Sequence, residues 1–173
     1  MANNYTQFSE VIDGITPEEC KWIELILSEV DGLMDLEDVV GRASKEGQKL
    51  LGLIDTLGVG ECDIENSWPG FGWEIKPITE RNDKDRKGPQ YLWIYSEEAG
   101  DVDHVRFFIQ GFLRKFRPTE VFKMTWADTC SRLRVGEFSG GGLAISKDDV
   151  YWVCSEDSVN EAADIMKAKL SKP

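Results

Sequence analysis

The residues best suited to nucleophilic catalysis are the one histidine of the chain, His104, and four scattered cysteines. A thiolate at Cys130 beside the His104 imidazole would form a nucleophile and its base. His104, however, is expected in the first turn of a helix beside Asp101 and Asp103, where a capping or solvated role is usual. The cysteines form no CxxC pair, and a zinc site would need distant ligands to converge. We therefore expect no catalytic residue, no metal and no cofactor.

A second pattern leaves an enzyme open as an alternative. Glu74-Ile75-Lys76 on an expected strand, with Asp63 upstream, has the acid-x-lysine form of metal-dependent nucleases. In such enzymes paired carboxylates hold Mg²⁺ and the lysine orients the attacking water. Pro77 follows the lysine directly, which favours an edge strand or a strand end. The surrounding acidic residues oppose the approach of DNA.

The charge of the chain limits its partners. The 173 residues carry a net charge of -12, which opposes binding to a nucleic acid because phosphates are bound mainly by Lys and Arg. Residues 1–65 hold 15 acids and 4 bases, whereas residues 66–140 hold 11 acids and 12 bases. This shift predicts a boundary near residues 61–66, with an acidic helical part at 1–65 and an α+β core at 66–173.

Helix signals are clearest at three places. Thr16-Pro17-Glu18-Glu19 combines an N-cap, a proline at the first helical position and a capping-box glutamate. A second helix is expected over residues 36–56, although its three glycines weaken the pattern. Residues 101–117 carry an apolar stripe, acids in the first turn and bases in the last, and predict an amphipathic helix that covers a sheet. Ser158 and Glu161 predict the cap of a final helix.

Strands are expected between these helices. Residues 73–78 alternate with period two, 91–95 are aromatic and β-branched, and 121–129 and 143–153 supply further strands. The glycine-rich stretch 136–142 predicts a turn, since it lacks the lysine and helix of a phosphate loop. The predicted fold class is α+β: an N-terminal acidic helix pair, then a mostly antiparallel sheet packed by an amphipathic helix, in the order α-α-β-β-α-β-β-α.

Partner-binding residues are expected on the acidic helices and on one aromatic turn. Carboxylates on rigid helices can imitate a phosphate ladder, because Lys and Arg bind both by charge-assisted hydrogen bonds. Trp68 and Phe71 lie in a Pro/Gly turn and form an interaction hot spot if they are exposed. The candidate residues are Glu24, Asp31, Asp35, Glu37, Asp38, Trp68 and Phe71.

Four segments carry a resemblance to other proteins. They are Tyr91–Gly100, Phe112–Pro118, Thr125–Ser131 and Arg134–Gly142, and together with their surroundings they cover about half of the chain. In these segments the chain resembles a family of small uncharacterised proteins from phages and bacterial mobile elements. The resemblance implies a context, that of inhibitors of host defence such as anti-CRISPR proteins, and assigns no role to any residue.

These observations lead to one functional hypothesis and two alternatives. The leading hypothesis is a non-enzymatic, phage-type inhibitor that binds the basic, nucleic-acid-binding surface of a host defence complex as a nucleic-acid mimic. The alternatives are the metal-dependent nuclease and an immunity or antitoxin protein that binds a basic toxin. The sequence contains no signal peptide or membrane span, so a cytoplasmic location in a bacterial host is expected. A homodimer could form by strand pairing at the Trp73 edge.

Overall fold

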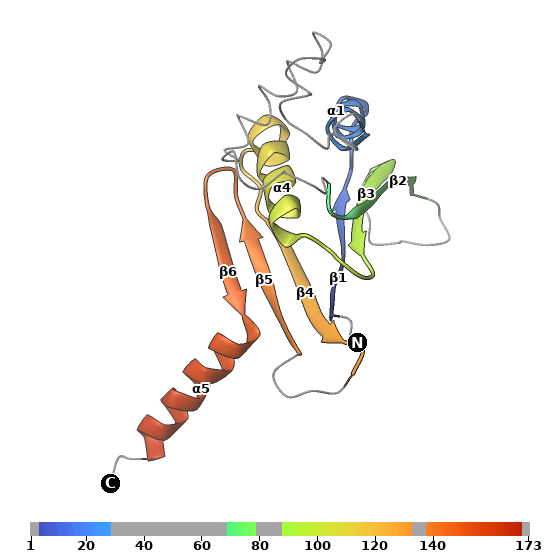
Figure 1. Cartoon of the computed structure of the whole chain (residues 1–173). Coiled ribbons are helices and arrows are strands. Elements are labelled where there is room, and N and C mark those ends of the chain that lie inside the picture. Colours follow the sequence, from blue (N-terminus) through green and yellow to red (C-terminus); the bar gives the residue numbers. More distant parts are fainter. Residues whose placement is uncertain (1–3, 29–68, 79–87, 133–137, 171–173) are drawn as a thin grey trace, which may run out of the picture.

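The central feature of the fold is one antiparallel sheet. The computed structural model describes residues 4–28, 69–78, 88–132 and 138–170, and within these ranges six strands pair in the order β2-β3-β1-β4-β5-β6 (Figure 1). The strands are β1 (Asn4–Asp13), β2 (Gly72–Pro77), β3 (Gln90–Ser96), β4 (Phe122–Cys130), β5 (Ser139–Ile145) and β6 (Val150–Cys154).

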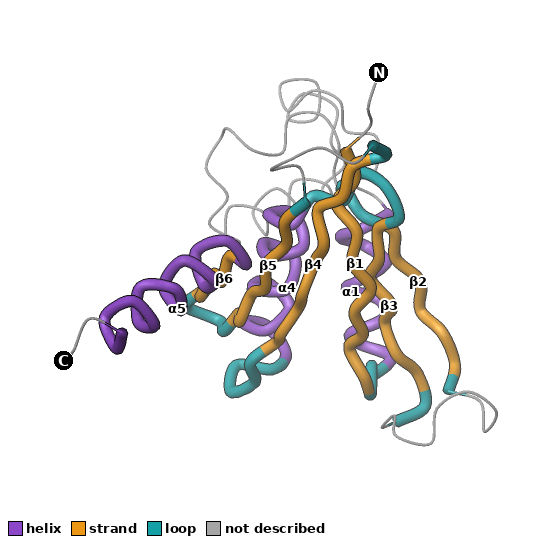
Figure 2. Tube along the Cα trace, turned by 90° about the horizontal axis from the view of Figure 1, so that it is seen from below, coloured by secondary structure: helices purple, strands orange, loops and turns teal. Residues whose placement is uncertain are grey.

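Two of the three described helices cover one face of this sheet. Helices α1 (Pro17–Ser28) and α4 (Val102–Phe116) lie on the same side of the strands, whereas α5 (Ser155–Leu170) runs away from the sheet beyond the β6 edge (Figure 2). None of the described helices is long and apolar enough to cross a membrane.

The predicted α+β class and antiparallel sheet are confirmed, but the predicted order is wrong. The chain begins with β1, and α1 follows it, so no acidic helix pair opens the described fold. The strand was missed because its sequence alternates poorly: Phe8 and Ile12 face the core, with the charged Glu10 between them. The expected helix at 36–56 and the boundary at 61–66 lie outside the described residues.

Several local predictions hold. The capping box at α1 forms as expected, because Thr16 Oγ1 accepts from the Glu19 N–H and the Glu19 carboxylate accepts from the Thr16 N–H. Asp101 caps α4 by accepting from the His104 N–H at 2.9 Å. Two predictions fail: part of the expected glycine turn lies within β5, and α5 begins at Ser155, with Ser158 inside it and donating to the Cys154 carbonyl.

The core lies between the sheet and the two covering helices. The α4 stripe buries Phe108 and Phe112 completely, and Trp22 of α1 stacks on Phe108 with ring centroids 5.8 Å apart. The sheet meets them with Leu92, Ile145 and other fully buried side chains. Since burying one such side chain contributes about 1.5–3 kcal/mol, the contacts of α1 and α4 with the sheet contribute strongly to stability on this face.

Strand β1 changes partners along its length. Residues Asn4–Gln7 pair with β4, and residues Phe8–Asp13 pair with β3, so β1 and β4 separate beyond Gln7 (Figure 2). The Glu10 carboxylate bridges the gap by accepting from the Thr125 N–H at 2.8 Å. Burial raises the pKa of Glu10, and the hydrogen bonds from Thr125 oppose that rise only in part.

A buried ion pair joins three elements at the other end of α4. The Arg117 guanidinium donates to both carboxylate oxygens of Glu19, at 2.8 and 3.3 Å, and to the carbonyls of Asp13 and Gly14. Burial alone would raise the pKa of Glu19, but the bonds from Arg117 and Thr16 outweigh it, so the Glu19 pKa is lowered. The end of β1, the start of α1 and the end of α4 are thus held by one cation.

We expect Arg117→Ala to lower the free energy of unfolding by about 3–5 kcal/mol, because it leaves the Glu19 carboxylate buried without its cation. Urea unfolding at pH 7 measures this. Lys115→Ala, an exposed change on the same helix, is the control and should cost less than about 0.5 kcal/mol. A loss below about 1 kcal/mol for Arg117→Ala would contradict the role of the pair.

The same pair makes stability depend on pH. Because the Glu19 pKa is lower in the folded state, its contribution is present above the unfolded value of 4.5 and is lost as the pH falls through the folded pKa. Wild type should therefore lose stability on acidification more steeply than Glu19→Gln. Parallel slopes for the two proteins below pH 5 would be the opposing result.

Candidate functional site

The residues predicted to bind a partner are only partly within the described structure. Glu24 is exposed on α1, as a contact residue must be. Phe71, in contrast, is only 9% exposed and packs against Phe108. It is therefore part of the core and cannot be a hot spot on the surface. The others, Asp31, Asp35, Glu37, Asp38 and Trp68, lie outside the described residues.

The acid-x-lysine pair of the nuclease alternative lies on the outer face of the sheet, opposite the helices. Lys76 Nζ is 3.0 Å from Glu74 Oε2 and 3.9 Å from the centre of the Trp93 ring. Tyr95 donates to the same glutamate at 3.3 Å. Asp63 lies outside the described residues, and within the described ranges no group of three or more side chains could hold a metal ion.

His104 is buried in the first turn of α4, with Nε2 3.6 Å from Asp101 Oδ2. Cys130 is buried at the end of β4, opposite Asn4 of β1. Each residue has a place in the packing of its own element, and the cysteine–histidine pair gains no geometric support.

A different site appears where α4 begins. A pocket of about 500 Å³ lies between the N-terminal end of α4, the loop before it and the ends of β1, β4 and β6. We call it the acidic pocket. The residues that matter below are Thr6, Glu98, Asp101, Asp103, Trp126, Asp128 and Trp152.

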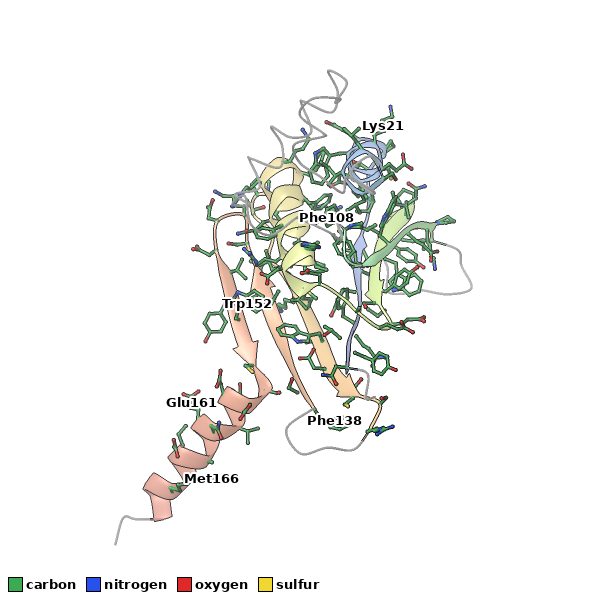
Figure 3. The ribbon with its side chains drawn as sticks, viewed as in Figure 1. Lys21, Phe108, Phe138, Trp152, Glu161 and Met166 are labelled. Carbon is green, nitrogen blue, oxygen red and sulfur yellow. The ribbon has the colours of Figure 1, made fainter. Side chains whose placement is uncertain are left out.

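The aromatic wall of the acidic pocket is a pair of indoles. Trp126 of β4 and Trp152 of β6 meet edge to face with centroids 5.9 Å apart. Gly141 of β5 lies between their strands, opposite Trp126 in the register, and a Cβ there would overlap the Trp126 ring. The glycine thus makes room for the indole to lie flat against the sheet, and Trp152 remains 46% exposed on the rim (Figure 3).

The carboxylate of the pocket is held entirely by neutral donors. Asp128 accepts from Thr6 Oγ1 at 2.8 Å, Trp126 Nε1 at 3.2 Å and Ser139 Oγ at 3.0 Å. A carboxylate has about four acceptor positions, so one remains for a further donor. Within the described residues no Lys or Arg forms an ion pair with Asp128.

The opposite wall is a loop fastened to β1. The Thr6 N–H donates to the Glu98 carbonyl at 2.7 Å, and the Gly100 N–H returns to the Thr6 carbonyl at 3.1 Å. A Cβ at Gly100 would overlap the Phe8 ring and Ser96, so only glycine permits this close approach. The loop therefore holds Glu98 and Asp101 at fixed positions on the pocket wall.

The pocket is consequently acidic. Four carboxylates line it, from Glu98, Asp101, Asp103 and Asp128, and Arg106 lies 3.1 Å from Asp103 as a counter-charge. Aromatic faces and a carboxylate together favour a cation, since the ring attracts it electrostatically and the carboxylate accepts its N–H groups. Chemically, the arrangement is suited to holding a Lys or Arg side chain.

Sequence reasoning missed this site, although its parts were visible. Three of the four segments that carry the resemblance contribute to it: Glu98–Gly100 in the first, Trp126 and Asp128 in the third, and Ser139 and Gly141 in the fourth. One signal could have found it: Trp126 and Asp128 are two residues apart on a strand and therefore share one face. A carboxylate beside a tryptophan is unusual on a face that meets the core.

Asp128→Ala should lower the free energy of unfolding by about 1–3 kcal/mol and shift the Trp126 indole N–H resonance, because the indole loses its acceptor. Asp128→Asn should be nearly neutral, since its oxygen can accept from Trp126 and Ser139 while its NH₂ donates to Thr6. Urea unfolding and the indole region of an ¹H–¹⁵N spectrum measure both. Equal losses for the two variants would refute the proposed bonding.

Comparison with known proteins adds no relative: no family model, no curated protein and no solved structure matches the chain.

Proposed function

We propose that the chain is a non-enzymatic binding protein that engages a basic surface of a protein partner, with the acidic pocket taking an Arg or Lys side chain. The observation that carries the proposal is Asp128, a carboxylate held by three neutral donors beside two indoles. Its hydrogen bonds fix its position without neutralising its charge. A cationic side chain of the partner would supply a fourth hydrogen bond and a counter-charge, which no Lys or Arg of the described residues supplies as an ion pair.

The charge of the whole chain supports the same class of partner. At a net charge of -12, encounter with a basic surface is accelerated and encounter with a nucleic acid is opposed. Glu24, exposed on α1, adds to the acidic surface of the described part. We also propose a second contact area at the acidic residues Asp31, Asp35, Glu37 and Asp38, for which the sequence is the only support.

The partner we propose is a nucleic-acid-binding protein, because such proteins present the clustered Arg and Lys that a phosphate-like surface can occupy. We further propose that the setting is inhibition of host defence, as the resemblance to phage and mobile-element proteins implies. An immunity or antitoxin protein that binds a basic toxin would use the same pocket and differ only in its partner. Within the described residues, Glu74 is engaged by Lys76 and Tyr95 and belongs to no group of three side chains that could hold a metal ion, so no observation there favours the nuclease alternative.

A peptide titration tests the pocket directly. The probe is Gly-Arg-Gly with blocked ends, and its match is Gly-citrulline-Gly, which has nearly the same shape without the charge. We expect the arginine peptide to shift the Trp126 indole N–H resonance and the citrulline peptide to leave it in place. Asp128→Asn should weaken binding of the arginine peptide about tenfold with its fold intact, since a hydrogen bond to a charged group contributes about 1.5–3 kcal/mol.

The control is Asp149→Asn, which removes one exposed carboxylate from the turn between β5 and β6. It should bind the arginine peptide with the affinity of wild type. That result would show that the weaker binding of Asp128→Asn does not come from the loss of one negative charge alone. Two results would contradict the proposed role of the pocket: equal shifts of the Trp126 resonance with the arginine and citrulline peptides, or equal affinity of wild type and Asp128→Asn for the arginine peptide.

Capture of partners from a bacterial lysate separates the pocket from the predicted helical surface. Two baits are compared with wild type: Asp128→Asn, and a triple charge reversal at Glu24, Asp31 and Asp35. If the pocket makes the main contact, the first bait loses the basic partners identified by mass spectrometry. If the helical acids make it, the triple reversal loses them and Asp128→Asn retains them.

A further inference from the structure

The C-terminal helix is amphipathic, and among the described residues its main contacts are with β5 and β6, the strands beside its start. Its apolar stripe, which we call the α5 stripe, consists of Val159, Ala162, Ala163 and Met166, spaced at i, i+3, i+4 and i+7. Val159 is 67% exposed and Met166 66% exposed. Figure 3 shows Met166 near the far end of the projecting helix, with no other element beside it. A soluble helix with such a stripe normally buries it.

The sheet beside this helix has an open apolar surface of matching kind. On the face opposite α1 and α4, a groove of about 590 Å³ crosses β4, β5 and β6, which we call the outer groove. Its floor is flat because β5 contributes Gly142 and Ala144, and its far side is formed by Tyr151 and Val153, which are 71% and 43% exposed. Lys123 stands on its near side.

The helix cannot reach the groove of its own chain. Strand β6 ends at Cys154 and α5 begins at Ser155, so no residue separates them to allow a reversal of direction. Figures 1 and 2 both show the helix leaving the sheet beyond the β6 edge. Within the described part of the chain, both the α5 stripe and the outer groove are therefore uncovered at the same edge of the sheet, and a second copy could cover both.

We propose that two copies of the chain form a two-fold dimer in which the α5 stripe of each copy packs into the outer groove of the other. Such an interface is self-complementary and closed, as a dimer requires, because the same edge supplies both the helix and the groove. The exchanged element is joined to its own sheet without a linker, so its direction is fixed before association. That rigidity lowers the ordering cost of binding.

Area and charge are both compatible with this arrangement. A typical specific interface buries about 1,600 Å² in total, or about 400 Å² on each of the four surfaces of two reciprocal contacts. Half the side of a helix about 24 Å long and 10–12 Å across supplies about that area. Helix α5 carries four acids, Glu156, Asp157, Glu161 and Asp164, against two bases, Lys167 and Lys169, whereas the groove carries Lys123, which makes no ion pair within the described residues.

Sedimentation velocity over about 1–200 µM protein tests the dimer, in about 150 mM salt so that repulsion between the two acidic copies is screened beyond about 8 Å. Wild type should dimerise in this range. The helix variant, Val159→Glu with Met166→Glu, should dimerise at least 30-fold more weakly, because two carboxylates would face the apolar groove. Its control, Asn160→Glu with Ile165→Glu, adds the same charge outside the stripe and should change the dimer constant less than about threefold.

The groove variant, Tyr151→Glu with Val153→Glu, should also be monomeric, and both changes are at exposed side chains, so the fold is retained. The decisive measurement is the mixture of helix and groove variants. Only the mixed pair has one intact contact, the helix of the groove variant in the groove of the helix variant, so the mixture should dimerise where neither variant does alone. Three results would overturn the proposal: monomeric wild type throughout, no restoration in the mixture, or a groove variant that still dimerises, which would indicate helix-to-helix pairing.

Discussion

The fold depends on one partly buried guanidinium. Arg117 ends α4, and its donors reach the first turn of α1 and the last carbonyls of β1, so three elements distant in sequence are fixed at one point. Without this cation, the Glu19 carboxylate that completes the α1 capping box would be buried without a counter-charge. The aromatic layer of Trp22, Phe108 and Phe112 packs beside it, so its geometry rests on the same junction.

Elements with a local sequence pattern could be predicted from the sequence. Elements that depend on pairing with distant strands could not. The α4 helix was readable from its stripe and its charges, and the α1 start from its capping box. Strand β1 was not, because a central strand with Glu10 on its core-facing side breaks the expected alternation. Glu10 is tolerated there because β1 and β4 separate and its carboxylate replaces a strand as acceptor for the Thr125 N–H, which no single-strand pattern reveals.

The candidate site was less predictable than the fold for the same reason. The acidic pocket is assembled from the ends of β1, β4 and β6 and the loop before α4, and only pairing brings Thr6, Trp126 and Asp128 together. The glycines of β5 predict a turn from the sequence, because glycine is usually depleted in strands. In the structure they make two surfaces possible: Gly141 admits the Trp126 ring on one face, and Gly142 keeps the other face flat. Conversely, Phe71 followed a Pro/Gly turn and suggested exposure, yet it belongs to the core.

The direct joint between β6 and α5 has a mechanical consequence. Strand β6 is the edge of the sheet and pairs only with β5 within the described residues, through the register from Gly141–Cys154 to Ile145–Val150. Tension applied to the helix is therefore passed directly to the pair next to Cys154, and from there along the ladder to one neighbouring strand. Strand β1, by contrast, is paired with two strands, with β4 along Asn4–Gln7 and with β3 along Phe8–Asp13. Load on the C-terminal helix thus enters the sheet through a single pair of strands.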